Sequence, residues 1–208
     1  MLEARAITFG YPGRPPLYRD FNLRVGSDER VALHAPSGFG KTTLCQMLAG
    51  YLRPSAGQVL VDGKPLPRRG VCPVQMIWQH PEHAVDPRMR MRATLAEAGV
   101  RIDAAGRADD PRHQRILEEL GIQERWIARY PHELSGGELQ RFCIARALAA
   151  APRYLVADEI STMLDAVTQA HIWRVLLEES QAAGIGIVLV SHSPALTARV
   201  ATRVLDLA

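Results

Sequence analysis

The sequence predicts an α/β fold of two lobes, in which a helical insert separates a β-rich first segment from a returning strand–helix–strand unit. Three observations predict it. Short segments with period-2 alternation, bounded by turn residues, fill the N-terminal part. Helical periodicity replaces them from about Met89 to Ala150, and two continuous apolar runs follow, as in the buried strands of a parallel sheet.

The N-terminal segments are expected to be antiparallel strands, because turn residues such as Tyr11-Pro12-Gly13 and Asp62-Gly63 separate them. The predicted strands are Ala4–Phe9, Phe21–Val25, Arg30–His34 and Gln58–Val61. Further along, Val74–Trp78 is expected to be a strand, and 101–111 a solvated loop. The last predicted elements are the strands Tyr154–Ala157 and Ile185–Val190, with the helix Ala166–Gln181 between them.

Residues 35–43 read APSGFGKTT, a phosphate-binding loop, and the apolar spacing predicts a helix over Thr42–Tyr51 directly after it. In such a loop, consecutive N–H groups converge on anionic oxygens at a helix N-terminus, where the dipole favours negative charge. Gly38 and Gly40 would let the backbone approach closely. Ala35 stands where the pattern has its first glycine, so it must keep a negative φ to avoid strain.

The strand Tyr154–Ala157 ends in two carboxylates, Asp158 and Glu159. A strand end of this kind delivers negative charge to the edge of a sheet. There, one carboxylate would hold Mg²⁺ and the other would activate water. A plain helix N-cap is an equally simple interpretation of the pair taken alone.

The segment Leu134–Arg141 reads LSGGELQR, in which Ser135 is suited to cap a helix that begins with two glycines. Together with the phosphate loop and the acidic strand end, it resembles the ATPase subunit of an ABC transporter. The resemblance implies an α/β P-loop NTPase (ABC ATPase) core with an N-terminal antiparallel β subdomain and an inserted α-helical subdomain. We expect a single domain over 1–208, with 1–87 and 151–208 as the nucleotide-binding lobe and 88–150 as the helical one.

The resemblance also implies how ATP would bind. Tyr11 would stack on adenine, although Tyr18 competes for that role. Lys41 would reach the β- and γ-phosphates. The other implied ATP-binding residues are Ser37, Gly38, Phe39, Gly40, Thr42, Thr43 and Gln79.

Catalysis would rest on Glu159, which would polarise the attacking water, assisted by His192 and Lys41. The implied Mg²⁺ ligands are Thr42, Gln79 and Asp158. His80 and His83 are taken as surface or packing residues. In the family, the signature contacts ATP held by a partner subunit, so one signature implies a homo- or heterodimer. The implied signature residues are Leu134, Ser135, Gly136, Gly137 and Glu138, and those at the dimer seam are Thr162, Leu164 and Asp165.

A finer resemblance covers 74–81, 85–88 and 144–149, which are similar to the oligopeptide and nickel importer subfamily. It implies transmembrane permease subunits, an external solute-binding protein, and a place on the cytoplasmic face of the membrane. No apolar run approaches the ~18 residues that span a bilayer, and the N-terminus lacks the pattern of a signal peptide.

The formal net charge is only +3 and no basic block is interleaved with aromatics, so no nucleic-acid partner is expected. Two alternatives to a transporter ATPase remain open. One is a soluble ATPase of this type acting on ribosomes or DNA, which usually carries two cassettes or a coiled-coil insert. The other is a degenerate partner subunit that binds ATP without turnover, favoured only by Ala35 and Thr162.

Overall fold

The computed structural model describes residues 1–162 and 164–207. The chain forms two compact units. Unit 1 comprises Met1–Met76, Arg153–Asp158 and Ser180–Ala208, and unit 2 comprises Ile77–Pro152 and Glu159–Glu179. Within the described residues, no helix combines the length and apolar character needed to cross a membrane.

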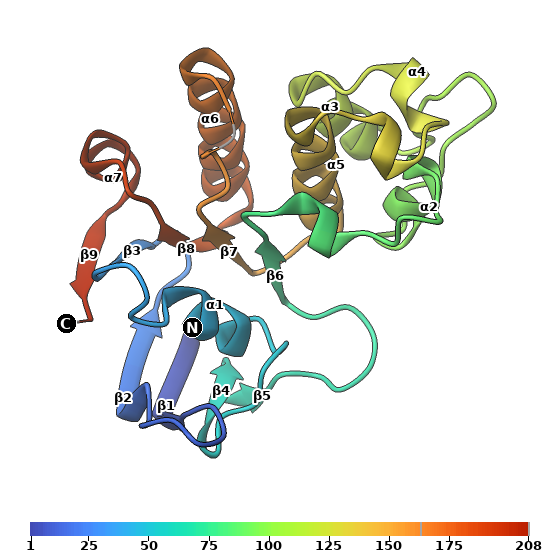
Figure 1. Ribbon diagram of the computed structural model, residues 1–208. Helices are drawn as coiled ribbons and strands as arrows, with labels where there is room; N and C mark the ends of the chain where they lie inside the picture. The colour runs from blue at the N-terminus through green and yellow to red at the C-terminus, as the bar shows by residue number, and fades with distance from the viewer. Residues whose placement is uncertain (163, 208) are drawn as a thin grey trace. The chain divides into compact units, whose positions relative to one another are not determined.

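Unit 1 contains an antiparallel sheet, drawn in blue to cyan in Figure 1. Its strands lie in the order β2-β1-β4-β5. Their bounds are β1 Leu2–Phe9, β2 Tyr18–Val25, β4 Ala56–Val61 and β5 Lys64–Pro65. The register between β1 and β4 shifts between Arg5 and Thr8. Gly57 lies at this irregularity with φ +78°, and a Cβ there would stand 2.3 Å from the Ala6 carbonyl oxygen, so only glycine fits.

The second sheet of unit 1 has the order β6-β7-β8-β3-β9. Its strands are β3 Arg30–His34, β6 Val74–Ile77, β7 Tyr154–Asp158, β8 Gly186–Val190 and β9 Arg203–Asp206. The prediction that the whole N-terminal part is antiparallel is wrong for β3, which pairs in parallel with β8 and with β9. Val31, Ala32 and Leu33 form a continuous buried run in β3, which is the signature of a parallel strand rather than of a half-exposed antiparallel one.

Helix α1, Lys41–Leu48, follows the phosphate loop and ends three residues before the predicted end at Tyr51. The reason is Gly50, whose φ of +81° lies in the left-handed region. Its N–H bonds the Met47 carbonyl and the Tyr51 N–H bonds the Gln46 carbonyl, which closes the helix. Tyr51 is therefore exposed instead of continuing the buried face.

Two elements near the C-terminus were not predicted. Helix α7, Pro194–Val200, begins where the Ser193 hydroxyl accepts the Leu196 N–H, with proline in its first turn. Strand β9 is exposed at three of its four residues, so it shows no alternation of buried and exposed positions. It forms because its backbone pairs with β3 at the edge of the sheet.

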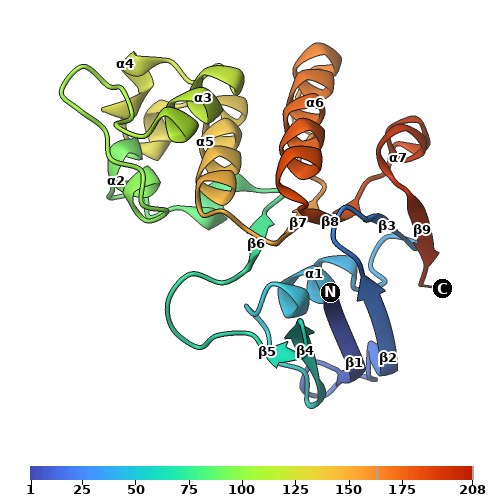
Figure 2. The same ribbon diagram turned by 180° about the vertical axis from the view of Figure 1, so that it is seen from behind.

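Unit 2 is mainly helical, and Figure 2 shows α2 to α5 gathered together. The elements are η1 Pro81–Ala84, α2 Met91–Ala96, α3 Pro111–Glu119, α4 Glu124–Ile127, η2 Pro131–Glu133, α5 Gly136–Ala149 and α6 Ala166–Ala183. The segment predicted as a loop before Pro111 contains a small antiparallel bridge between Ile102 and Ala108. Helix α6 extends two residues beyond the predicted end at Gln181.

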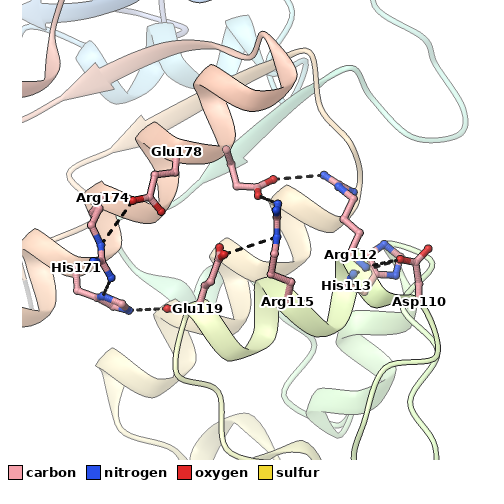
Figure 3. Close-up of polar contacts among 9 residues, drawn as sticks. Asp110, Arg112, His113, Arg115, Glu119, His171, Arg174 and Glu178 are labelled. Atoms are coloured by element: carbon pink, nitrogen blue, oxygen red, sulfur yellow. Dashed lines mark hydrogen bonds and ion pairs between the residues drawn. The ribbon is translucent and has the colours of Figure 1, made fainter.

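Arginine side chains hold α3 in place within unit 2. Arg112 donates to the Leu148 carbonyl at 3.0 Å and Arg141 donates to the Leu120 carbonyl at 2.6 Å, so each links α3 to α5. Glu179 of α6 has only 3% of its surface exposed and forms ion pairs with Arg112 and Arg115. Figure 3 shows both arginines projecting from α3 toward α6. These contacts position α5, the helix that the signature begins.

Candidate functional site

The phosphate loop curls around its own lysine. Lys41 is 8% exposed, and its Nζ donates to the carbonyl oxygens of Ala35 at 2.8 Å and Pro36 at 3.0 Å. Gly38 and Gly40 have φ of +80° and +100°, which L-residues rarely adopt, so these two glycines make the curl possible. The loop opens α1, which places its N–H groups at a helix N-terminus, where anions bind favourably.

Ala35 does not strain the loop. It is buried and is not among the residues with positive φ, so the methyl group is compatible with this backbone. Its carbonyl is available to Lys41, as a glycine's would be. Ala35 therefore gives no support to the interpretation of this chain as a degenerate, non-hydrolysing subunit.

Two tyrosines contact the start of α1 in different ways. Tyr11 is 42% exposed, its hydroxyl lies 3.1 Å from Thr43 Oγ1, and its ring meets Phe9 edge to face. Tyr18 is buried, and its hydroxyl donates to the Gly40 carbonyl at 3.1 Å. Because stacking on a base needs an exposed ring face, Tyr18 is unsuited to that role and Tyr11 stays the predicted residue.

Asp158 is the last residue of β7 and is 2% exposed. Helix α1, which carries Thr42, contacts β7 within unit 1. Thr42 is exposed, and so is His192, which follows β8 after one intervening residue. Among the predicted site residues, unit 1 thus holds Tyr11, the phosphate loop, Asp158 and His192.

Glu159 follows β7 directly and is held at both its side chain and its backbone. Gln79 Nε2 donates to Glu159 Oε2 at 2.9 Å, so the structure brings these two predicted residues together within unit 2. Glu159 has φ +50°, a left-handed conformation that costs a non-glycine residue energy. Its carbonyl accepts the Thr162 hydroxyl at 3.1 Å and the Thr162 N–H at 3.3 Å, which stabilises that turn.

The signature segment forms the N-terminus of α5, as the sequence predicts. The Ser135 hydroxyl accepts the Glu138 N–H at 3.3 Å, and a Glu138 carboxylate oxygen accepts the Ser135 N–H at 2.8 Å. This capping box leaves Gly136 exposed in the first turn. A Cβ on Gly137 would stand 3.1 Å from Leu164 Cδ2, so the signature and the predicted seam loop are in close contact.

The predicted seam loop is anchored to α6. The Ser161 hydroxyl accepts from Gln169 Nε2 at 2.8 Å and from Trp173 Nε1 at 3.4 Å. Asp165 Oδ1 accepts the N–H groups of Val167 and Thr168, both at 3.0 Å. Asp165, and not the Asp158-Glu159 pair, is therefore the N-cap of this helix. Met163, in the same loop, lies outside the described residues.

Sequence reasoning missed the contacts by which Tyr18 and Ser161 shape these loops. Each acts through a hydroxyl whose partner is distant in sequence, Gly40 for Tyr18 and Trp173 for Ser161. The burial of Ser161, a small polar residue at 7% exposure, became visible only in the structure.

Comparison with known proteins assigns the family. The model of the family described as "ABC transporter" matches residues 18–162, more than half of the 208 residues. The nickel import ATP-binding protein NikE of Brucella abortus (strain 2308) is 35% identical over 206 residues, which cover 94% of this chain and 77% of that protein. The energy-coupling factor transporter ATP-binding protein EcfA of Methanothermobacter thermautotrophicus is 34% identical over 214 residues, 98% of this chain and 67% of that protein.

Among solved structures, the dimeric structure of MJ0796, described as a bacterial ABC transporter cassette, superposes with a TM-score of 0.83 at 25% identity. The match covers 100% of this chain and 94% of that one. Fold, family match and the ordered motifs agree. The chain therefore belongs to the ABC transporter family, as an ATP-binding subunit whose activity is ATP hydrolysis coupled to transport.

Proposed function

We propose that this chain powers an importer by closing as a dimer on ATP, and that its cargo is nickel, a related metal complex or an oligopeptide. The observation that carries the ATP-binding part is the phosphate loop, with Lys41 enclosed by the carbonyls of Ala35 and Pro36. An incoming triphosphate would offer Lys41 stronger, charge-assisted partners than these neutral carbonyls. Tyr11 is the proposed adenine platform, since its ring is exposed beside α1.

Mg²⁺ suits the oxygen donors of unit 1. The hydroxyl of Thr42 and the carboxylate of Asp158 are the hard ligands that Mg²⁺ prefers, together with phosphate oxygens. The family resemblance also implies Gln79 as a ligand, and its amide oxygen is the candidate atom, since its amide nitrogen donates to Glu159. The ion would supply charge neutralisation at the phosphates. Within the described residues no cluster of three or more His, Cys, Asp or Glu forms a metal site, and one carboxylate with phosphate oxygens is the usual Mg²⁺ arrangement.

The proposed catalytic roles are those that the family resemblance implies. Glu159 would accept a proton from the attacking water, and Gln79 would hold the carboxylate in place for that step. His192 would assist near the γ-phosphate. The exposed first turn of α5, with Ser135 and Gly136, would bind the γ-phosphate of ATP held by the second subunit.

The import direction and the cargo class rest on the resemblance of the 74–88 stretch and on the NikE relative. EcfA is nearly as similar as NikE, which is why the cargo is proposed as a class and not as one compound. The proposed partners are a second ATPase subunit, transmembrane permeases and an external solute-binding protein. The chain would reach the cytoplasmic face of the membrane through the permeases.

The first test is steady-state ATP hydrolysis by the purified chain over a range of protein concentrations, with Lys41→Ala as the control. A rate that rises more steeply than protein concentration, and that Lys41→Ala abolishes, supports a homodimeric site. ATP binding without turnover at any concentration points to an obligate heterodimer or to a degenerate partner subunit. Co-expression with any permeases that prove to be encoded beside the gene, followed by uptake of nickel and of a short peptide, tests the cargo. If neither nickel nor the peptide is taken up, the proposed class of cargo is contradicted.

A further inference from the structure

Tyr18 is a buried aromatic residue in contact with the phosphate loop. It lies at the start of β2 with 4% of its surface exposed. Its ring stands at 60° to that of Phe21 at a centroid distance of 5.3 Å, and edge to face with that of Phe39 at 6.5 Å. These neighbours hold the ring, so its hydroxyl has little freedom to move.

The hydroxyl reaches one atom of the loop. Tyr18 donates to the Gly40 carbonyl oxygen at 3.1 Å, and this oxygen also accepts the Leu44 N–H of α1 at 3.0 Å. The helix supplies one hydrogen bond, while the other comes from a strand outside the helix. Burial raises the pKa of Tyr18, so the phenol stays protonated and remains a donor.

The geometry of Gly40 agrees with this close approach. A Cβ on Gly40 would stand 3.3 Å from Leu17 Cδ1 and 3.5 Å from Tyr18 Cε2, and its φ is +100°. The strand end 17–18 therefore packs directly on the glycine. A side chain at this position would press on Leu17 and would lie in van der Waals contact with the Tyr18 ring.

The Gly40 carbonyl and the Lys41 N–H belong to one peptide group. That group is planar and trans, with its C=O and N–H directed oppositely, so an anchored carbonyl sets the direction of the N–H. The Lys41 N–H is the first of α1, where backbone donors have no partner within the helix. In a phosphate loop, such donors bind the α- and β-phosphates.

We propose that Tyr18 is a positioning residue for nucleotide binding: its hydroxyl fixes the Gly40–Lys41 peptide so that the Lys41 N–H is pre-oriented toward the phosphates. This inference rests on the proposed binding of ATP at the phosphate loop. Pre-orientation acts on binding because it lowers the cost of ordering the loop when the nucleotide arrives.

The test compares Tyr18→Phe with Tyr154→Phe in the full chain. Tyr18→Phe keeps the ring and removes only the hydroxyl. Tyr154 is also a buried tyrosine of unit 1, but it begins β7, about 13 Å along the strand from Asp158. It therefore reports on the loss of a buried phenol hydroxyl away from the loop. Calorimetric titration measures the Kd for Mg-ATP and for ADP, alongside KM, kcat and thermal unfolding.

We expect Tyr18→Phe to weaken ATP and ADP binding by the same factor, about three- to tenfold, which corresponds to one net hydrogen bond. KM should rise by a similar factor while kcat stays within about twofold, because the lost contact would stabilise bound ATP and the transition state equally. Tyr154→Phe should leave both Kd values at wild type. The proposal is overturned if Tyr18→Phe binds both nucleotides as tightly as wild type, or if both variants weaken binding equally. Failure of the wild-type chain itself to bind ATP would instead refute the proposed function.

Discussion

Gln79 Nε2 donates a hydrogen bond of 2.9 Å to Glu159 Oε2, linking two residues that are 80 positions apart in the chain. The backbone of Glu159 is held as well, because Thr162 donates to its carbonyl from both hydroxyl and N–H. Glu159 keeps a left-handed φ of +50° in this setting. Strain of this kind persists where neighbouring contacts over-determine a conformation, which is common at functional sites.

Glu159→Gln should lower the rate of steady-state ATP hydrolysis strongly while ATP binding persists. The amide keeps the shape of the side chain but cannot accept a proton, and loss of a general base lowers a rate about 10²- to 10⁴-fold. The measurement is phosphate release with a parallel titration of ATP. Glu178→Gln, on the exposed side of α6, is the matched control and should hydrolyse at the wild-type rate. Hydrolysis by Glu159→Gln at the wild-type rate would remove Glu159 from the role of base.

Gln79→Leu should lower kcat about tenfold, because the hydrogen bond that orients the Glu159 carboxylate is lost. In the Glu159→Gln background the part of the effect that acts through Glu159 should disappear, and only the loss of the proposed Mg²⁺ contact of Gln79 should remain. The comparison of the four rates is a double-mutant cycle, and it measures the coupling between the two residues directly. Additive effects on log kcat would show that Gln79 acts independently of Glu159.

Ala35→Gly should lower the free energy of unfolding by about 0.5–1 kcal/mol, since glycine has more conformational freedom in the unfolded chain. Ala35 has no positive φ that glycine would relieve, so ATP affinity should not improve. Thermal unfolding and ATP titration of the two proteins check both statements. Markedly tighter ATP binding by the variant would mean that the methyl group weakens the loop.

Glu179→Gln should destabilise the protein by about 2 kcal/mol, since removing one partner of a buried ion pair leaves the others uncompensated. Arg112 and Arg115 are 36% and 54% exposed, so solvent offsets part of the full loss. Glu178→Gln is the control, because its contact with Arg174, drawn in Figure 3, is 3.9 Å long and joins two side chains that are each more than half exposed. Urea unfolding measures the stability of both variants, and equal losses of stability would contradict the role of Glu179 as the buried partner of Arg112 and Arg115.

The stability supplied by Asp165 should depend on pH. The pKa of Asp165 lies below its usual value, mainly because its carboxylate accepts a hydrogen bond from the Thr168 N–H. A lowered folded-state pKa means that this contribution is complete above the unfolded pKa of about 3.9 and is lost as pH falls through the lower folded value. Asp165→Asn caps the helix without titrating there. The difference in Tm between wild type and Asp165→Asn should therefore shrink below about pH 4, and a constant difference would contradict this.

Much of unit 1 was predictable because its signals are local. The strand β2 alternates at period 2 from Phe21 to Val25, and β7 and β8 are continuous apolar runs. The left-handed glycines and lysine of the phosphate loop are contiguous in sequence. The parallel pairing of β3 was missed although Val31-Ala32-Leu33 is a continuous apolar run of the same kind, because β3 follows the antiparallel strands in sequence and its partners β8 and β9 lie far along the chain.

By itself, the sequence determined the motifs, their order and the secondary structure around them, because each depends on residues within a few positions of one another. It thereby identified Lys41, Ser135, Asp158 and Glu159 as candidate residues. Only the tertiary structure decided which side chains meet. The bonds from Gln79 to Glu159 and from Tyr18 to Gly40 depend on loops and strands that folding brings together. A hydrogen bond between distant residues leaves no period or spacing in the chain, so its existence is a property of the fold.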